Sequence, residues 1–342
     1  MSRVLHILYV GGGTGGHIFP LYALHQWLTQ SGLAGSRSRF VGLRGRIDSA
    51  IFVQLGVPHE LENLPQPTGL RTRLVYLLRA VRSWLGWLGR IGSYDAVVTS
   101  GGYGALPAVL AARVRSVPLL GYEPNAVTGR TMRFLGPRAV ASLARPFVNQ
   151  AQPLIRTELY PMSSQAPTAA TLLICGGSQG SLSLDRLMVA ALRSSWPEGI
   201  ERVVWLTGSA GYDEVRDVFG SDSRVELMAY SDAMVDLYRR CRVAVARAGA
   251  SSIFELAAWG IPTVYVPLPW SADDHQVANA RSAAALGWGF VVEEREGVAS
   301  LGQALGQALA WVVPPAGRPQ PDRARQYWTQ RICALAGGQA CA

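Results

Sequence analysis

The chain has 342 residues, of which 49% are hydrophobic and only 16% are charged. This composition excludes an intrinsically disordered chain, a collagen-like repeat and a small disulfide-stapled domain, and the length suits two domains of ordinary size. The formal net charge is +9, and all 32 basic residues are arginine. Mechanisms that need a lysine, such as a P-loop lysine or a Schiff base, are therefore excluded.

Short apolar runs alternate with helix-length segments along the chain. Strands that alternate with helices indicate parallel βαβ units, and hence an α/β fold with Rossmann-like domains. The runs that predict strands are 3–10, 38–42, 95–99, 117–121, 170–175, 201–206, 242–246 and 262–266.

A polar stretch divides the chain near its middle. Residues 149–170 are rich in Gln, Pro, Ser and Ala and lack apolar periodicity, which is typical of a linker. The sequence therefore predicts an N-terminal domain over 1–150, a linker over 151–169, a C-terminal domain over 170–320, and a closing helix and tail over 321–342.

The cysteines and the apolar runs bear on the compartment. Cys175, Cys241, Cys333 and Cys341 show no metal-ligand spacing, and scattered cysteines are typical of a reducing compartment. No apolar run reaches the roughly 18 residues that span a bilayer, and glycines interrupt the N-terminus too early for a signal peptide. We expect a cytoplasmic protein without a metal site.

Glycine loops follow several predicted strands. The loops at 11–16 and 176–180 each lead from a strand into a helix, where backbone N–H groups can cradle a phosphate. A tight turn with no ligand is the alternative. A dinucleotide site would place an acidic residue at the end of the second strand, but Arg44 and Arg46 are found there. Among dinucleotide-binding enzymes, this leaves only an NADP reductase as an alternative. A further glycine turn lies at 100–104.

Six short motifs occur in order along residues 11–280. They are GGTGGHIFP at 12–20, GGY at 101–103, Glu123 and Asn125 followed by Gly129, GGSQG at 176–180, RAGA at 247–250 with Glu255, and DHQ at 274–276 with NA at 279–280. Together they resemble the MurG family, the peripheral-membrane N-acetylglucosaminyltransferases of peptidoglycan synthesis.

This resemblance implies a fold and an activity. The fold would be that of the B-type glycosyltransferases, two Rossmann-like domains with a cleft between them. The reaction would move GlcNAc from UDP-GlcNAc to the MurNAc of lipid I, an undecaprenyl-diphosphate-linked acceptor, with inversion of the anomeric centre. Lipid II and UDP would form without a cofactor or a bound metal. The implied place is the cytoplasmic face of the bacterial plasma membrane, on an anionic lipid surface.

The resemblance also implies roles for individual residues. His17, at the start of a helix, would take the proton of the acceptor hydroxyl, and Asn125 would complete the catalytic pair. Gly101, Gly102, Tyr103 and Glu123 would lie on the acceptor side. The residues implied to bind the donor are Thr14, Gly15, Gly16, Asn125, Arg156, Ser178, Gln179, Gly180, Ser231, Ala250, Ser251, Ser252, Glu255 and Gln276.

Within the donor set, the implied contacts differ. Residues 178–180 would bind the diphosphate, Glu255 the ribose hydroxyls, Gln276 the GlcNAc hydroxyls and Ser231 the uracil edge. Purely structural alternatives stay open for several of them. These are a histidine bonded to its own loop (His17), a turn-forming asparagine (Asn125), a linker arginine (Arg156), a capping box (Ser252 with Glu255) and a solvated helix residue (Gln276).

The chain departs from the family pattern near the acceptor side. Tyr122 and Pro124 replace a histidine and a glutamine of the motif around Glu123, and Met132 replaces its closing asparagine. The segment 151–156 replaces the family's GNPVR. These departures motivate two alternatives: a related glycosyltransferase with another lipid or aglycone acceptor, and a nucleotide-sugar-binding homologue with weakened catalysis.

Residues 70–90 have the pattern of an amphipathic helix. Leu74, Leu77, Leu78, Val81, Leu85 and Leu88 share one side, which predicts a face packed on the core. The other side would hold arginines among aromatic rings, a mixture suited to anionic lipid head groups. The membrane contacts expected there are Tyr76, Arg79, Arg82, Trp84, Trp87 and Arg90. Half-buried tryptophans on an ordinary helix are the alternative, and the dispersed arginines give no nucleic-acid-binding motif.

Overall fold

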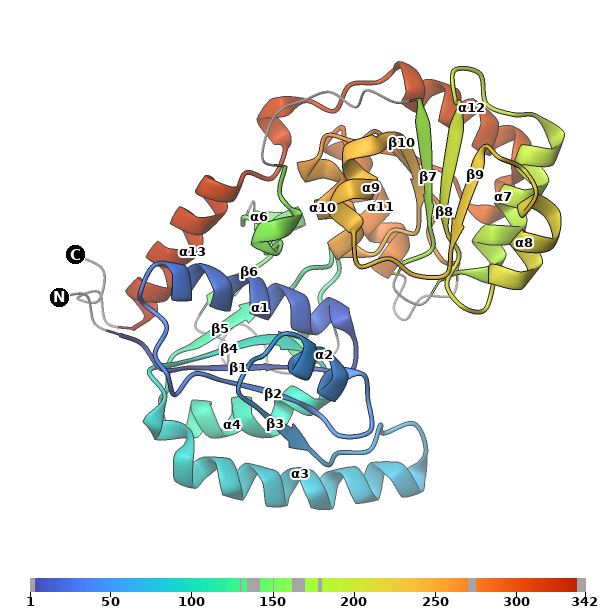
Figure 1. Ribbon diagram of the computed structural model, residues 1–342. Coiled ribbons are helices and arrows are strands. Elements are labelled where there is room, and N and C mark those ends of the chain that lie inside the picture. The colour runs from blue at the N-terminus through green and yellow to red at the C-terminus, as the bar shows by residue number, and fades with distance from the viewer. Residues whose placement is uncertain are drawn as a thin grey trace. The chain divides into compact units, whose positions relative to one another are not determined.

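A computed structural model describes residues 4–129, 131–133, 142–149, 151–161, 170–177, 180–269 and 275–336. The chain divides into two compact units, each built on one six-stranded parallel sheet (Figure 1). Unit 1 comprises Met1–Pro124, Thr128–Thr157 and Pro321–Ala342, and unit 2 comprises Asn125–Val127 and Glu158–Gln320. The C-terminal helix therefore packs with the N-terminal sheet.

The sheet of unit 1 has the strand order β3-β2-β1-β4-β5-β6. The strands are β1 (Ile7–Gly11), β2 (Arg39–Leu43), β3 (His59–Glu62), β4 (Ala96–Gly101), β5 (Leu119–Tyr122) and β6 (Ser142–Ala144). The helices are α1 (Gly15–Gln30), α2 (Asp48–Gln54), α3 (Leu70–Arg90), α4 (Leu106–Val114), α6 (Pro146–Asn149) and α13 (Pro321–Leu335).

Alternation along the central strands covers both faces of this sheet. Leu8 and Val10 of β1 pack with residues of α3 and α4 on one face. Tyr9, between them, stacks on Phe40 and meets the ring of His25 in α1 on the other face. Strands buried on both sides read as continuous apolar runs, and for that reason they were visible in the sequence.

Unit 2 repeats the same topology, with the order β12-β11-β10-β7-β8-β9. Its strands are β7 (Thr171–Cys175), β8 (Arg202–Leu206), β9 (Val225–Met228), β10 (Cys241–Ala246), β11 (Thr263–Tyr265) and β12 (Gly289–Val291). Its helices are α7 (Leu182–Ser194), α8 (Tyr212–Phe219), α9 (Met234–Arg240), α10 (Ala250–Ala258), α11 (His275–Ala285) and α12 (Gly297–Ala310). One core joins the sheet to α7, α8 and α12, and a second joins it to α9 and α10.

All eight predicted strands are present, and the α/β class is confirmed. The four strands that the sequence did not reveal, β3, β6, β9 and β12, are the edge strands of the two sheets. They have three or four residues each, and β3 reads HELE. An edge strand is covered on fewer sides, so it does not need the long apolar run that marks a central strand. No helix within the described ranges is both long and apolar enough to cross a membrane.

The orientation predicted for α3 is wrong. Tyr76 and Trp87, expected at the membrane, are 7% and 1% exposed, and Trp84 is half-buried against the core of unit 1. The Tyr76 hydroxyl donates to the Tyr103 carbonyl at 2.7 Å, and the Trp87 indole donates to Glu62 at 2.8 Å. Two large rings with satisfied polar atoms bury more area than leucines do, and they turn this side of the helix inward.

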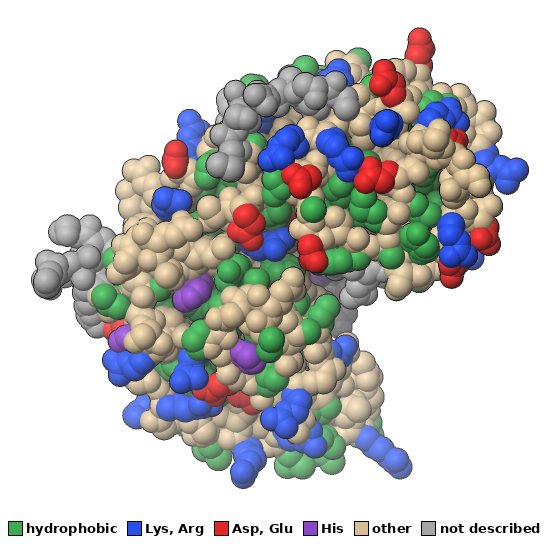
Figure 2. Space-filling view, viewed as in Figure 1, with side chains coloured by type: hydrophobic (Ala, Val, Ile, Leu, Met, Phe, Trp, Pro, Cys, Tyr) green, Lys and Arg blue, Asp and Glu red, His purple; other side chains and the backbone are tan. Residues whose placement is uncertain are grey.

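The leucine side of α3 faces outward instead. Leu74, Leu77, Leu78, Val81 and Leu85 are between 54% and 66% exposed, and we call these five residues the leucine face. Arg79 bonds to Asn63, and Arg90 pairs with Glu60 while it stacks on the Trp87 ring. Arg82 is exposed. Figure 2 shows arginine and apolar side chains next to one another along the lower edge, where α3 lies in Figure 1.

The reversed orientation of α3 makes a direct prediction for stability. Trp87→Ala removes a fully buried ring and leaves Glu62 without its indole donor, and we expect it to destabilise the protein by about 3–5 kcal/mol. Leu78→Ala, on the leucine face, should change stability by no more than about 0.5 kcal/mol. Urea unfolding followed by circular dichroism measures both, and equal losses would contradict the burial described here.

Candidate functional site

The loops with site residues meet the two sheets at equivalent points. In both sheets the strands follow the doubly wound order 3-2-1-4-5-6, so the order reverses between β1 and β4 in unit 1 and between β7 and β10 in unit 2. Ligands of open parallel sheets bind beyond the carboxyl ends of the strands at this switch point. The loops that leave these four strands are 11–16, 101–105, 176–181 and 247–250.

The first glycine loop is held from behind by a buried carboxylate. Asp48, which is 0% exposed, accepts the Gly13 N–H on both oxygens at 2.9 Å and the Leu43 N–H at 2.7 Å. A Cβ on Gly12 would collide with its Oδ2, so only glycine fits there. Thr14 then caps α1, and Gly15 and Gly16 form its first turn, with Thr14 and Gly16 exposed. These are backbone positions suited to an anion.

His17 has its ring oriented by the neighbouring strand. Its Nδ1 lies 3.0 Å from the Ser100 carbonyl, and the Ser100 hydroxyl donates to the His17 carbonyl at 2.8 Å. Because a carbonyl oxygen only accepts, Nδ1 carries the hydrogen, and in the neutral ring Nε2 is then the basic nitrogen. The His17 ring is therefore held by the Ser100 carbonyl at the end of β4, and Nε2 is the ring nitrogen that can accept a proton.

The second loop of unit 1 lies directly against the first. Gly101 and Gly102 have φ angles of 88° and 83°, which favour glycine, and a Cβ on Gly102 would lie 3.3 Å from the Gly12 carbonyl. Tyr103 follows, and its ring meets that of Tyr76. Three of the four residues expected on the acceptor side therefore belong to a loop that packs against the loop before His17.

Two buried polar residues, Glu123 and Asn279, hold the segment that follows β5. Glu123 is 3% exposed and accepts the Gly129 N–H at 2.7 Å, which closes the turn between them. Asn125 groups with unit 2, where its Oδ1 accepts from Asn279 Nδ2 at 3.0 Å. Asn279 also accepts the Ala126 N–H at 2.8 Å. Glu123 therefore positions the turn that carries Asn125.

Tyr122, which departs from the family motif, is part of the core of unit 1. It is 0% exposed, its ring meets that of Trp328 in α13, and its hydroxyl accepts the Leu154 N–H at 3.1 Å. Burial raises the pKa of Tyr122 well above its usual value. The departure is thus accommodated by packing. Two residues after Leu154, the Arg156 guanidinium stacks 4.5 Å from the Phe19 ring of α1.

The glycine loop of unit 2 makes a turn that excludes side chains. A Cβ on Gly176 would lie 2.5 Å from the Ser181 nitrogen, and one on Gly180 would collide with the Thr207 carbonyl. Gly177 and Gly180 have φ angles of 87° and 72°. Ser178 and Gln179, both expected to bind the donor, lie outside the described residues.

The helix α10 begins just after β10, which pairs with β7, so its N-terminus lies beside the glycine loop that follows β7. Gly249 is its N-cap, and Ala250, Ser251 and Ser252 form its first turn, with both serines half-buried. Among the residues that the structure describes, no side chain caps this end. Ser252 lies inside the helix and not at its N-cap, so it does not form the capping box considered with Glu255. Uncapped N–H groups at a helix start attract phosphate oxygens.

The remaining donor residues lie on three different elements of unit 2. Glu255, one turn further along α10, accepts from the Tyr238 hydroxyl at 2.8 Å. Gln276 in α11 accepts the Leu268 N–H at 3.0 Å. Ser231, in the turn after β9, accepts the Ala233 N–H at 3.1 Å. All three follow the carboxyl ends of strands, as the ligand edge requires.

A buried arginine joins the loops of unit 2. Arg247, which is 4% exposed, donates to the Ser181 hydroxyl at 2.7 Å and to the Ser183 hydroxyl at 2.6 Å. It also donates to the Val266 carbonyl at 3.0 Å and forms an ion pair with Glu294. One planar guanidinium thereby fixes the ends of β10 and β11 and the start of α7.

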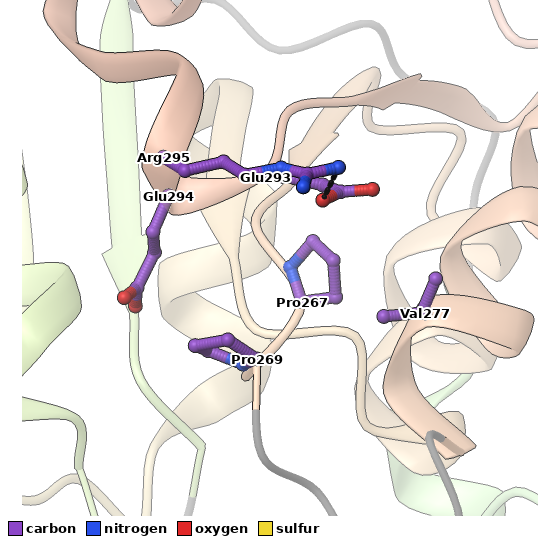
Figure 3. Close-up of a pocket in the computed structure, with 6 residues that line it drawn as sticks. All are labelled: Pro267, Pro269, Val277, Glu293, Glu294 and Arg295. Carbon is purple, nitrogen blue, oxygen red and sulfur yellow. Dashed lines mark ion pairs between the residues drawn. The ribbon is translucent and has the colours of Figure 1, made fainter.

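A cavity of about 400 Å³ opens beside this cluster (Figure 3). It lies beyond the carboxyl ends of β11 and β12, and Val277, the residue after Gln276, lines it. Arg295 pairs with Glu293 at one side of it at 2.8 Å, while Glu294 belongs to the Arg247 cluster. The lining residues are Pro267, Pro269, Val277, Glu293, Glu294 and Arg295.

Comparison with known proteins matches both units to one family. The N-terminal domain of glycosyltransferase family 28 matches residues 7–143, and the C-terminal domain of that family matches residues 171–313. A UDP-N-acetylglucosamine–N-acetylmuramyl-(pentapeptide) pyrophosphoryl-undecaprenol N-acetylglucosamine transferase of Syntrophotalea carbinolica is 32% identical, covering 85% of this chain and 86% of its own. The chain belongs to the MurG family of glycosyltransferases.

Other relatives and solved structures agree with this assignment. A transferase of the same name from Synechococcus sp. strain WH7803 is 35% identical, with 84% of this chain and 83% of that protein covered. The crystal structure of Acinetobacter baumannii MurG superposes with a TM-score of 0.71 at 24% identity, over 98% of this chain and 95% of that one. The spinosyn rhamnosyltransferase SpnG bound to thymidine diphosphate gives 0.62 at 16% identity, over 97% and 98%. The glycosyltransferase B fold expected from the motifs is confirmed.

Several site residues of this MurG-family chain were not found from the sequence. The sequence identified Arg247 only as part of the RAGA motif, with no role of its own, and it gave no indication of Asp48 or Tyr238. Each of the three lies behind a loop or a functional side chain and meets it through the fold. The sequence offers one signal for such residues, which is a charged residue among apolar neighbours. That signal predicts a buried, hydrogen-bonded charge, but it does not identify the residues that bond to it.

Asp185 is a further buried acid behind the unit 2 loop. It is 1% exposed in α7, and its Oδ1 accepts the Trp205 indole N–H at 2.8 Å. Its Oδ2 makes no hydrogen bond within the described part of the chain. Burial raises the pKa of Asp185 to about 6, against the lowering effect of the Trp205 hydrogen bond.

This shifted pKa predicts a pH-dependent stability. Because the folded-state pKa lies above the unfolded value, the native state holds the proton more tightly, and that stabilisation is lost as the pH rises through about 6. Asp185→Asn removes the titration. When the pH rises from 5 to 7.5, the unmodified chain should therefore lose about 1 kcal/mol more of its free energy of unfolding than the variant does. Urea unfolding at both pH values measures this. The exposed Asp236→Asn serves as control, and an equal gain there would refute the assignment.

Proposed function

We propose that this chain transfers GlcNAc from UDP-GlcNAc to the MurNAc of lipid I and so forms lipid II. The observation that carries the proposal is the relation to transferases of that name over most of both chains, combined with a loop geometry that keeps the family's motif residues at the ligand edges of both sheets. Unit 2 would hold the donor, and unit 1 the acceptor.

On the donor side, backbone and side-chain groups would divide the work. The loop with Ser178, Gln179 and Gly180 and the first turn of α10 would surround the diphosphate with N–H groups and hydroxyls. Glu255 would accept the ribose hydroxyls, and Gln276, with Asn125, would bind hydroxyls of GlcNAc. The turn at Ser231 would meet the uracil edge through its backbone. Arg156 would add positive charge at the diphosphate.

On the acceptor side, His17 would act as the general base. The acceptor hydroxyl would lose its proton to Nε2 while its oxygen forms the bond to the anomeric carbon from the face opposite the diphosphate. The bond from that carbon to the phosphate oxygen breaks, and UDP leaves with the electron pair. N–H groups aimed at the diphosphate stabilise the charge that develops on it. The loop with Gly101, Gly102 and Tyr103 and the turn that Glu123 holds would line this side. Thr14, Gly15 and Gly16, in the loop before His17, would contact the donor.

A lipid-linked acceptor requires that the enzyme reach a membrane, and the leucine face of α3 supplies the surface. Its five exposed apolar residues lie on one side of a 21-residue helix that also carries the exposed Arg71, Arg73 and Arg82. Apolar side chains that enter the acyl boundary beside arginines at head-group level are typical of peripheral helices on anionic membranes. We assign the membrane contact to this face, and Tyr76 and Trp87 to the core beneath it.

The activity is tested by transfer of radiolabelled GlcNAc from UDP-GlcNAc to a short-chain lipid I analogue. The labelled disaccharide-lipid and UDP should form in equal amounts. Binding of UDP-GlcNAc without transfer to any acceptor would leave only a nucleotide-sugar-binding protein. Transfer to another lipid or aglycone, with none to lipid I, would overturn the peptidoglycan role alone.

His17 should matter for turnover and not for donor affinity. His17→Ala removes the proton acceptor, and we expect kcat to fall about 10²–10⁴-fold while UDP affinity stays within twofold. His59→Ala, a histidine of β3 outside the loops, is the matched control and should retain turnover. A parallel collapse of UDP binding in His17→Ala would show that the residue is not the base.

The leucine face should control membrane association. A Leu77→Ser, Leu78→Ser double variant removes two exposed apolar side chains, and we expect its affinity for vesicles containing phosphatidylglycerol to fall roughly tenfold or more. Val218→Ser, which alters an exposed apolar residue of unit 2, is the control. Vesicle flotation measures both, and unchanged flotation of the double variant would remove α3 as the docking surface.

A further inference from the structure

A buried tyrosine stands directly behind Glu255. Tyr238, near the end of α9, is 3% exposed, and its hydroxyl lies 2.8 Å from Glu255 Oε2. Seventeen residues separate the two, so the contact comes from the packing of α9 against α10 rather than from local helix geometry.

The ring of Tyr238 is fixed on several sides. It belongs to the core cluster that joins α9 and α10 to the sheet. Its ring centre lies 6.0 Å from that of Trp259, whose indole donates in turn to the Leu159 carbonyl at 2.7 Å. A side chain packed in this way has one available orientation, so its hydroxyl stays at a fixed point beside the carboxylate.

The direction of the hydrogen bond follows from the charges. Burial, and then the negative charge of Glu255, raise the pKa of Tyr238 well above its usual value. The hydroxyl therefore keeps its proton at neutral pH and donates it to Glu255 Oε2. A charge-assisted bond of this kind restricts rotation of the carboxylate about its terminal torsion, which is otherwise broad.

We propose that Tyr238 is a positioning residue that fixes the Glu255 carboxylate in the orientation needed to accept the ribose hydroxyls of the donor nucleotide. This inference rests on the proposed function, because it assumes that Glu255 meets the ribose. Tyr238 itself would touch neither the nucleotide nor the sugar. Its effect would reach the substrate only through the carboxylate.

The test compares UDP with 2′,3′-dideoxyuridine diphosphate, which lacks both ribose hydroxyls. Tyr238→Phe keeps the ring and removes only the hydroxyl, and we expect it to weaken UDP binding about fivefold to tenfold while dideoxy-UDP binding changes less than twofold. In the Glu255→Ala background, Tyr238→Phe should have no further effect on UDP, because the group through which it acts is gone. Isothermal titration calorimetry measures all of these affinities, and the KM for UDP-GlcNAc should rise more than kcat falls.

A matched control separates positioning from stability. Tyr265→Phe alters another fully buried tyrosine of unit 2, on β11, and should leave both nucleotide affinities unchanged. Thermal unfolding shows whether each variant is folded. Equal losses of UDP and dideoxy-UDP affinity in Tyr238→Phe, or no loss of either, would overturn the positioning role. Failure of the unmodified chain to bind UDP would instead overturn the proposed function.

Discussion

The hydrogen bonds from the Gly13 N–H to the Asp48 carboxylate form the contact on which the loops of unit 1 depend. The chain must leave β1, turn sharply and start α1 within a few residues, and Asp48 occupies the space into which any side chain on Gly12 would project. The turn therefore consists of glycine backbone, and the buried carboxylate accepts its Gly13 N–H. Once this turn is fixed, the second loop packs on it, and Ser100 orients His17.

In unit 2 a buried positive charge, rather than a buried carboxylate, holds the loops at the ends of the central strands. There Arg247 is the buried group, and it donates to serine hydroxyls and to main-chain carbonyls around the start of α7. A lone buried charge would be strongly destabilising, but here every part of the guanidinium has an acceptor and Glu294 balances its charge. The planar fork of arginine suits this arrangement, which a lysine would not reproduce. In a chain without lysine, arginine fills this buried position, and the proposed diphosphate contacts would come from backbone N–H groups, hydroxyls and Arg156.

Central strands, glycine loops and the motif residues that follow them were predictable from the sequence, because each is specified locally. The apolar runs of β1, β4, β7 and β10 and the glycines that end them mark the switch points directly. Edge strands such as β3 lack that signal. Contacts between distant elements, such as Asp48 with Gly13, Arg247 with Glu294 and Tyr238 with Glu255, depend on tertiary packing, and no spacing in the sequence encodes them. Tyr122 shows the converse: the sequence marked it as a departure, and only packing against Trp328 explains it.

The helix α3 shows why periodicity alone assigned the wrong face. It carries two apolar stripes on opposite sides, one of leucines and one built on Tyr76, Trp84 and Trp87, and either has the spacing of a core face. The fold buries the aromatic side, where Glu62 at the end of β3 accepts from Trp87 and the Tyr103 carbonyl after β4 accepts from Tyr76. The leucine face gains nothing from the fold. An exposed patch of five neighbouring apolar residues marks a surface that another body covers, and the proposed contact with an anionic membrane would bury it.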